Sequence, residues 1–167
     1  LKDRVRRALS WIERAADTAK EDKPPRFVDL WIGFNALYGT RHYGAEYSVG
    51  EYQDFAGFIS IFSGIPSGKE ALLSLMSRKY HQGRVRDLVQ NKYLWNQFWN
   101  NNESEFEWES ARELKKLELA ITHQDPEIFY GAMFRRLQVL RNQIFHGSAS
   151  ADTRRNKDAL VLAILLL

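Results

Sequence analysis

The sequence has no cysteine, and this absence excludes several kinds of site. A chain without cysteine forms no disulfide, holds no metal through thiolates and offers no cysteine nucleophile. It suits a reducing compartment, so we expect a cytoplasmic protein. The chain also has little excess of positive over negative charge, because 24 Lys and Arg against 21 Asp and Glu leave a formal net charge of only +3. So small a surplus indicates a local basic patch, not a general affinity for polyanions.

Long apolar runs are missing as well. The run of nine apolar residues from Ala159 to Leu167 is well short of the roughly 20 that cross a bilayer. No apolar core follows the charged N-terminal residues, so no secretory signal is predicted. We therefore expect no membrane association and interpret the run as part of a buried helix. Because the chain begins at Leu1 and stops within this apolar pattern, we expect one domain over residues 1–167, cut within or near its last helix.

Proline is rare, with only four residues, and no stretch alternates between apolar and polar residues as a strand does. Apolar residues instead recur at helical spacing in nearly every window. We therefore predict an all-α fold, a single helical-bundle domain of about six to eight helices. The expected helices lie near residues 5–19, 27–38, 55–62, 68–83, 103–121 and 126–146, with a capping box of Ser67 and Glu70 before the fourth and a final helix capped by Ser150 or Asp152.

The predicted helix from Pro126 to His146 is the most informative one. Asp125 before Pro126 is a favourable N-cap and first-turn pair, and Gly147 is a natural stop. A core-facing stripe is formed by Phe129, Met133, Leu137, Leu140 and Ile144. Helical geometry places Arg135, Asn142 and His146 on the side turned away from that stripe. A second apolar strip of Tyr130, Phe134 and Phe145 lies on the flank shared with Arg141, and it predicts a second packing partner.

The segment Arg141-Asn142-Gln143-Ile144-Phe145-His146 resembles the signature of the HEPN superfamily, an Arg and a polar residue, then three more residues and a His. It stands late in the chain, near the end of a long predicted helix. The earlier segment Trp31-Ile32-Gly33-Phe34-Asn35-Ala36-Leu37-Tyr38-Gly39 resembles the aromatic second helix of the Apea-like HEPN branch. The resemblance spans most of the chain.

This resemblance implies an endoribonuclease that works as a homodimer, needs neither metal nor cofactor, and takes part in stress or anti-phage defence. The resemblance further implies that RNA is cut by attack of the 2′-hydroxyl, which leaves a 2′,3′-cyclic phosphate. It also implies that Arg141 and His146 are catalytic. The chemistry of the residues agrees, since an imidazole transfers protons near neutral pH and a guanidinium holds a phosphate. Asn142, one turn before His146, is expected to orient the imidazole ring.

Further residues extend this hypothesis. A basic patch that attracts the RNA backbone is predicted from Arg135, Arg136, Arg154, Arg155 and Lys157, although neighbouring acids would neutralise a solvated face equally well. The strip of Tyr130, Phe134 and Phe145 is predicted to build the dimer interface, or alternatively to pack against the last helix. Further partners that the resemblance implies are an antitoxin or a nucleotidyltransferase.

Two other classes of function stay open. One is a non-catalytic HEPN module that binds RNA or a partner and dimerises, in which Arg141 forms an ion pair and His146 interacts with the last carbonyls of its helix. The other is a helical structural domain of a larger protein. Trp95 and Trp99 are one helical turn apart and offer surfaces for base stacking, but we predict that both are packed into the protein.

Overall fold

The computed structural model describes residues 2–39, 50–146 and 154–167, without the side chains of residues 154–156. Within these ranges the secondary structure is entirely helical, which confirms the all-α prediction. The elements are α1 (Lys2–Asp17), α2 (Lys23–Tyr38), α3 (Glu51–Ser63), α4 (Pro66–Met76), α5 (Lys79–Gln90), the 3-10 turn η1 (Lys92–Leu94), α6 (Asn96–Trp99), α7 (Glu103–His123), α8 (Pro126–Phe145) and α9 (Arg154–Leu166).

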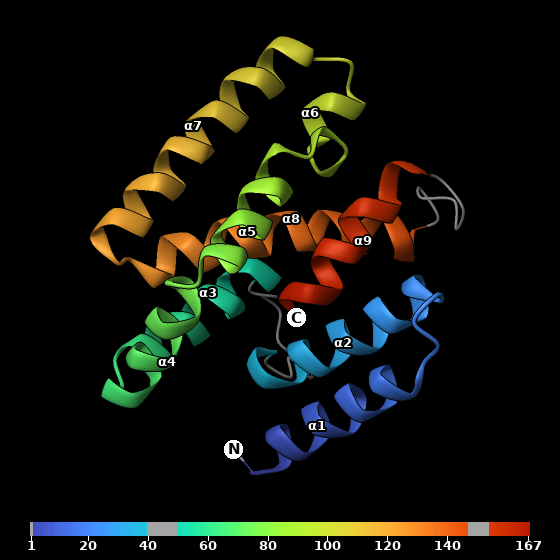
Figure 1. The fold of residues 1–167 in the computed structure, drawn as a ribbon, viewed down its shortest axis with the longest axis vertical. Helices are drawn as coiled ribbons and strands as arrows, with labels where there is room; N and C mark the ends of the chain where they lie inside the picture. Colours follow the sequence, from blue (N-terminus) through green and yellow to red (C-terminus); the bar gives the residue numbers. More distant parts are fainter. Residues whose placement is uncertain (1, 40–49, 147–153) are drawn as a thin grey trace.

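Helix α8 is the central element of the bundle. It packs against α2, α3, α4, α5, α7, α9 and η1. Figure 1 shows it crossing the middle of the molecule, with α7 toward one end of the long axis and the paired helices α1 and α2 toward the other. Most of its residues between Phe129 and Leu140 are buried. The exposed side chains of α8 therefore lie in its first turn and in its last turns.

The start of α8 follows the predicted local rules, whereas the predicted stop, Gly147, lies outside the described residues. The side chain of Asp125 accepts a hydrogen bond from the backbone N–H of Ile128 at 3.1 Å, and Pro126 occupies the first turn. These two residues satisfy or remove backbone donors that a helix start leaves unpaired. The predicted core stripe is confirmed, because Phe129, Met133, Leu137 and Leu140 are buried and Ile144 packs against the core.

Two sequence predictions about α4 and α5 are wrong. The capping box does not form, because α4 begins at Pro66, one residue before Ser67, and its N-cap Ile65 makes no side-chain bond. No helix ends near residues 81–83 either, since α5 runs from Lys79 to Gln90 through them. Burial of His81 and Val85 on one side of α5 explains the continuous helix, despite the intrinsic cost of Gly83 within it. The predicted caps Ser150 and Asp152 lie outside the described residues.

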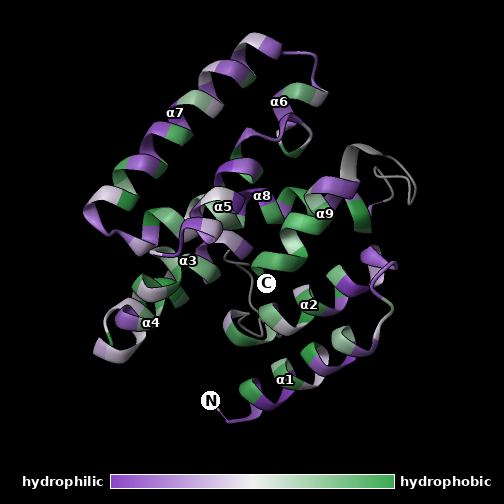
Figure 2. Ribbon diagram, viewed as in Figure 1, coloured by the Kyte–Doolittle hydropathy of each residue, from purple (hydrophilic) through white to green (hydrophobic). Residues whose placement is uncertain are grey.

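Helix α9 contains the terminal apolar run. Its residues Ala159, Leu160 and Ala163 are buried, and the helix packs against α2, α5 and α8. Figure 2 shows hydrophobic residues along most of its C-terminal half. The run is therefore helical as predicted, but only one side of it is buried, since Val161 and Leu165 are exposed. In the described part of the chain, each helix is too short or too polar to cross a bilayer.

The buried His81 makes stability depend on pH. Its ring stacks on Phe129 at 5.9 Å, and its pKa is lowered from 6.5 by burial and by the nearby charges of Arg84 and Arg78. The unfolded chain therefore binds this proton more readily than the folded protein does, so stability falls as the pH drops through about 6.5. Between about pH 8 and pH 5, we expect the melting temperature of His81→Phe to fall less than that of the wild type. His123→Phe, at an exposed position of α7, is the control. Parallel melting curves for His81→Phe and wild type would contradict this account.

Candidate active site at the end of α8

A hollow of about 350 Å³ lies between α6 and the C-terminal part of α8. We call it the α6–α8 hollow. Its lining residues are Asn96 and Trp99 from α6 and Val139, Asn142, Gln143 and His146 from α8 and its C-cap. The four residues of the second group follow helical spacing, so one side of α8 forms this wall. Asn142 and His146 thus lie together, as the sequence predicts.

His146 is exposed at the C-cap of α8. Its backbone N–H donates to the carbonyl of Asn142 at 3.0 Å, which closes the last turn. Among the described residues, no hydrogen bond or ion pair involves its imidazole. The predicted hydrogen bond from Asn142 to the ring does not form, because the Oδ1 atom of Asn142 accepts from Arg141 instead. His146 thus lines the hollow as an exposed residue whose ring has no hydrogen-bond or ion-pair partner in the described part of the chain.

Arg141 is held on both sides of its guanidinium. Its Nη2 atom donates to the Oε2 atom of Glu51 at 2.8 Å, and its Nη1 atom donates to the Oδ1 atom of Asn142 at 2.7 Å. The rings of Trp31 and Phe145 lie 5.8 and 5.6 Å from the guanidinium carbon. The Arg141 side chain is 26% exposed. Arg141 therefore lies beside the hollow, to which Asn142 connects it, and Glu51 offsets part of its charge.

Glu51, at the start of α3, organises this side of the site. Its two carboxylate oxygens also accept from Gln138 Nε2 at 3.1 Å and from the Tyr38 hydroxyl at 3.4 Å. The pKa of Tyr38 is raised first by burial and then by the charge of Glu51. Sequence reasoning did not single out Glu51, because 90 positions separate it from Arg141 and no local pattern links them.

The predicted dimer-forming strip is wrong for two of its three residues. Tyr130 and Phe134 are buried inside the chain, where the Tyr130 hydroxyl donates to the carbonyl of Leu72 and Phe134 stacks on Phe55 with ring centroids 4.2 Å apart. Helices α3 and α4 supply these contacts, so the second packing partner lies in the same chain. Phe145 alone remains available, being 53% exposed beside His146.

The predicted basic patch does not form as expected, because the structure buries Arg136 and places Arg135 at a different hollow. Arg136 is only 7% exposed, donates to the carbonyl of Leu94 at 2.8 Å and lies 3.6 Å from the Trp95 ring centroid. Burial lowers its pKa to about 10, and Arg136 is not available to RNA. Arg135 pairs with Glu113 at 2.8 Å and lines a different hollow. Lys157 is exposed, whereas the side chains of Arg154 and Arg155 lie outside the described part of the structure.

The two tryptophans of this region differ from each other. Trp95 is buried, which confirms its predicted packing, and its indole N–H donates to the carbonyl of Val89 at 2.8 Å. Trp99 is 44% exposed and lines the α6–α8 hollow, so the prediction that it is packed into the protein is wrong. A short helix of four residues carries Trp99, and its position relative to α8 cannot be read from helical periodicity.

Metal ligands do not cluster at this site. In the described part of the chain, no group of three or more His, Cys, Asp or Glu side chains is arranged to hold a metal ion. The hollow instead presents amides, an imidazole and an aromatic ring. Such groups bind organic and phosphate-containing ligands through hydrogen bonds and stacking.

Comparisons with known proteins give no relative. No model of a protein family matches the chain, and neither a curated protein nor a solved structure matches it.

The part-buried pair of Glu51 and Arg141 is expected to stabilise the fold. We expect Glu51→Gln to lower the free energy of unfolding by about 1–2 kcal/mol, because it weakens several hydrogen bonds to a charged group at once. For a chain of this size the melting temperature falls by about 3–6 °C. Glu118→Gln removes the charge from the more exposed pair with Arg86 and should cost less than about 1 kcal/mol. Equal losses in the two variants, measured by thermal unfolding, would contradict the role given to Glu51.

Proposed function

We propose that this chain is a HEPN-type endoribonuclease that cuts RNA without a metal ion. In this proposal the ribose 2′-hydroxyl attacks the adjacent phosphorus, the bond to the 5′-oxygen breaks, and a 2′,3′-cyclic phosphate remains. One observation carries the proposal. His146 lines the same hollow as Asn142, whose side-chain oxygen accepts a hydrogen bond from Arg141.

His146 is the proton-transfer group in this mechanism. An imidazole accepts a proton from the attacking hydroxyl or supplies one to the leaving oxygen near neutral pH. His146 is exposed at the helix end, where a substrate can approach it. Asn142 is a positioning residue, because its Oδ1 atom fixes the guanidinium while its amide N–H groups remain free of protein partners in the described ranges.

Arg141 supplies the positive charge for the phosphate. A guanidinium has five N–H donors, and the described contacts to Glu51 and Asn142 use only part of them. Glu51 orients the group from one side, and the exposed edge is left for the phosphate oxygens. Charge that develops on those oxygens in the transition state is stabilised by this fixed donor.

In this proposal a second copy of the chain completes the catalytic site. A single imidazole does not serve as base and acid in the same step, so two copies with the ends of α8 facing each other supply one of each. Phe145, exposed next to His146, is the apolar residue placed for this contact. RNA is the substrate in a cytoplasmic stress or defence response, with an antitoxin or nucleotidyltransferase as regulator.

A non-catalytic binding module is the second candidate function. The ion pair of Arg141 with Glu51 favours it, because the carboxylate offsets charge that a catalytic guanidinium would direct at phosphate. In this case the residues of the motif retain affinity for RNA or a partner without cutting.

Cleavage of RNA tests the proposal directly. We expect the purified protein to cut total RNA or transfer RNA in the presence of EDTA and to leave cyclic-phosphate ends. His146→Ala should lower the rate by about 10²–10⁴-fold, the usual effect of losing a proton-transfer group. His123→Ala, which removes an exposed histidine at the far end of α7, is the matched control and should cut at the wild-type rate.

Each outcome of this experiment has a clear meaning. Full activity in His146→Ala would contradict the assignment of the catalytic residue. Intact RNA with the wild type, under conditions where RNA is bound, would favour the binding module. Cleavage that stops when EDTA is added would contradict the metal-independent mechanism.

A further inference from the structure

We infer that the α6–α8 hollow is a subsite for one unpaired nucleobase of RNA, which stacks on Trp99 beside His146. This inference rests on the proposed function, because it names the part of the substrate that the site takes. It assigns a binding role to α6, which the HEPN resemblance does not address. Four observations support it: the fixed ring of Trp99, the amides around it, the size of the hollow and the nearby positive charge.

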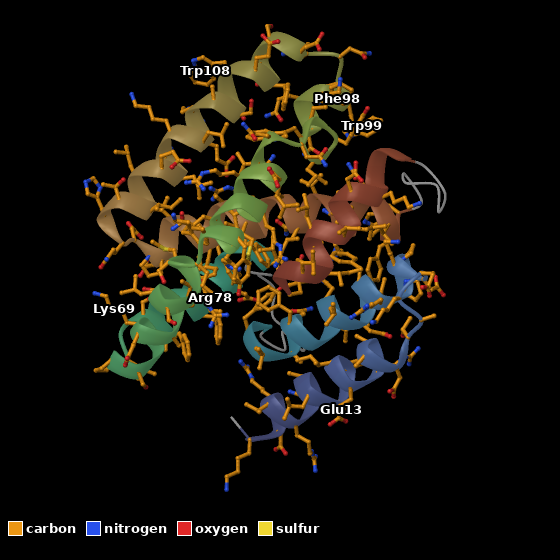
Figure 3. The ribbon with its side chains drawn as sticks, in the orientation of Figure 1. Glu13, Lys69, Arg78, Phe98, Trp99 and Trp108 are labelled. Carbon is orange, nitrogen blue, oxygen red and sulfur yellow. The ribbon has the colours of Figure 1, made fainter. Side chains whose placement is uncertain are left out.

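Trp99 is held in place while part of its ring stays open. Its indole N–H donates to the carbonyl of Tyr93 at 3.0 Å, and its ring contacts Phe98 edge-on with centroids 5.5 Å apart. Figure 3 shows Trp99 and Phe98 together at α6, well apart from Trp108 on α7. A tryptophan fixed in this way loses little conformational entropy when a flat ring stacks on it. Every base offers such a ring, so stacking favours RNA of any sequence.

The amides of the hollow match the edge of a base. Gln143 donates to the same Tyr93 carbonyl at 2.6 Å, so one backbone atom links Trp99 to the wall formed by α8. The Oε1 atom of Gln143 is buried without a hydrogen-bond partner among the described residues. Asn96 is exposed on the opposite side, and Asn142 contributes N–H donors that have no partner among the described residues. Asn and Gln side chains read the donors and acceptors of base edges.

The size of the hollow limits its occupant. Its volume of about 350 Å³ lies at the lower end of the range for small-ligand sites, which suits one base and its ribose. A base inside a duplex is already stacked and paired, so only a loop, bulge or single strand presents a base that enters.

A positive charge lies beside Tyr93 and Phe98, the two rings that contact Trp99. The Nζ atom of Lys92 is 4.9 Å from the ring centroid of Phe98, and Lys92 is exposed. A cation at this position attracts the phosphate that follows a bound nucleotide. The subsite therefore combines stacking, hydrogen bonding and phosphate attraction, and it places the bound nucleotide next to His146.

Binding of a short single-stranded RNA with 2′-O-methyl riboses tests the inference. The modified ribose has no attacking hydroxyl, so cleavage does not affect the measurement. We measure the Kd by fluorescence anisotropy. Trp99→Ala should raise it about tenfold, which is within the range for loss of one stacked base. Trp99→Phe retains a stacking ring and should recover most of the affinity. Trp108→Ala, which removes a more exposed tryptophan on α7, should bind as the wild type does.

A change in the RNA gives the same test without altering the protein. Replacing each nucleotide in turn by an abasic one should identify a position where the wild type loses about tenfold in affinity. The abasic replacement at that position should not weaken binding to Trp99→Ala any further, because this variant already lacks the stacking ring. A fully paired duplex of the same sequence should bind more weakly than the single strand.

The outcomes separate this inference from the proposed function. Base-dependent binding through Trp99 with no cleavage of unmodified RNA would support the subsite and contradict the ribonuclease. Cleavage that depends on His146, with wild-type binding in Trp99→Ala, would support the ribonuclease and overturn the subsite. No binding of single-stranded RNA by the wild type, or equal losses in Trp99→Ala and Trp108→Ala, would also overturn it.

Discussion

The burial of Phe134 fixes how α8 is rotated about its own axis, and the candidate site depends on this rotation. Five aromatic rings from α2 and α3 surround the Phe134 ring, and the closest of them, Phe55, is parallel to it within 4°. A close-packed interior accepts few other arrangements of such large side chains. With Phe134 turned toward α2 and α3, the wall formed by Asn142 and His146 is turned toward α6.

This rotation also separates the two principal residues of the motif. Arg141 and His146 are five positions apart, so their side chains leave the helix about 140° from each other. Arg141 turns toward α3, where Glu51 pairs with it, while His146 reaches the hollow beside Trp99. Asn142 connects the two directions through its bond to Arg141. A phosphate near Arg141 and a base on Trp99 would therefore bind on either side of Asn142.

Local signals were enough to predict the central helix and its core face. The N-cap Asp125 and the stripe from Phe129 to Leu140 depend only on residues a few positions apart, and both predictions are confirmed. Periodicity identifies apolar faces but not which elements cover them, so Phe134 is predicted at a dimer interface or against the last helix and not against α3. The contacts of Glu51 with Arg141 and of Tyr93 with Gln143 join residues 90 and 50 positions apart. No repeating pattern marks such pairs, and the role of Trp99 depends on one of them.

The central claim is that RNA binds against the imidazole of His146. The chain contains only four histidines, so their ring nitrogens can be followed individually by nitrogen-15 NMR. The measurement is a titration of the protein with a short 2′-O-methyl RNA while the side-chain signals of His146 and His123 are recorded. The account predicts that the His146 signals shift in proportion to bound RNA, while those of His123, exposed at the end of α7, stay in place. Saturated binding that leaves the His146 signals unchanged would contradict it.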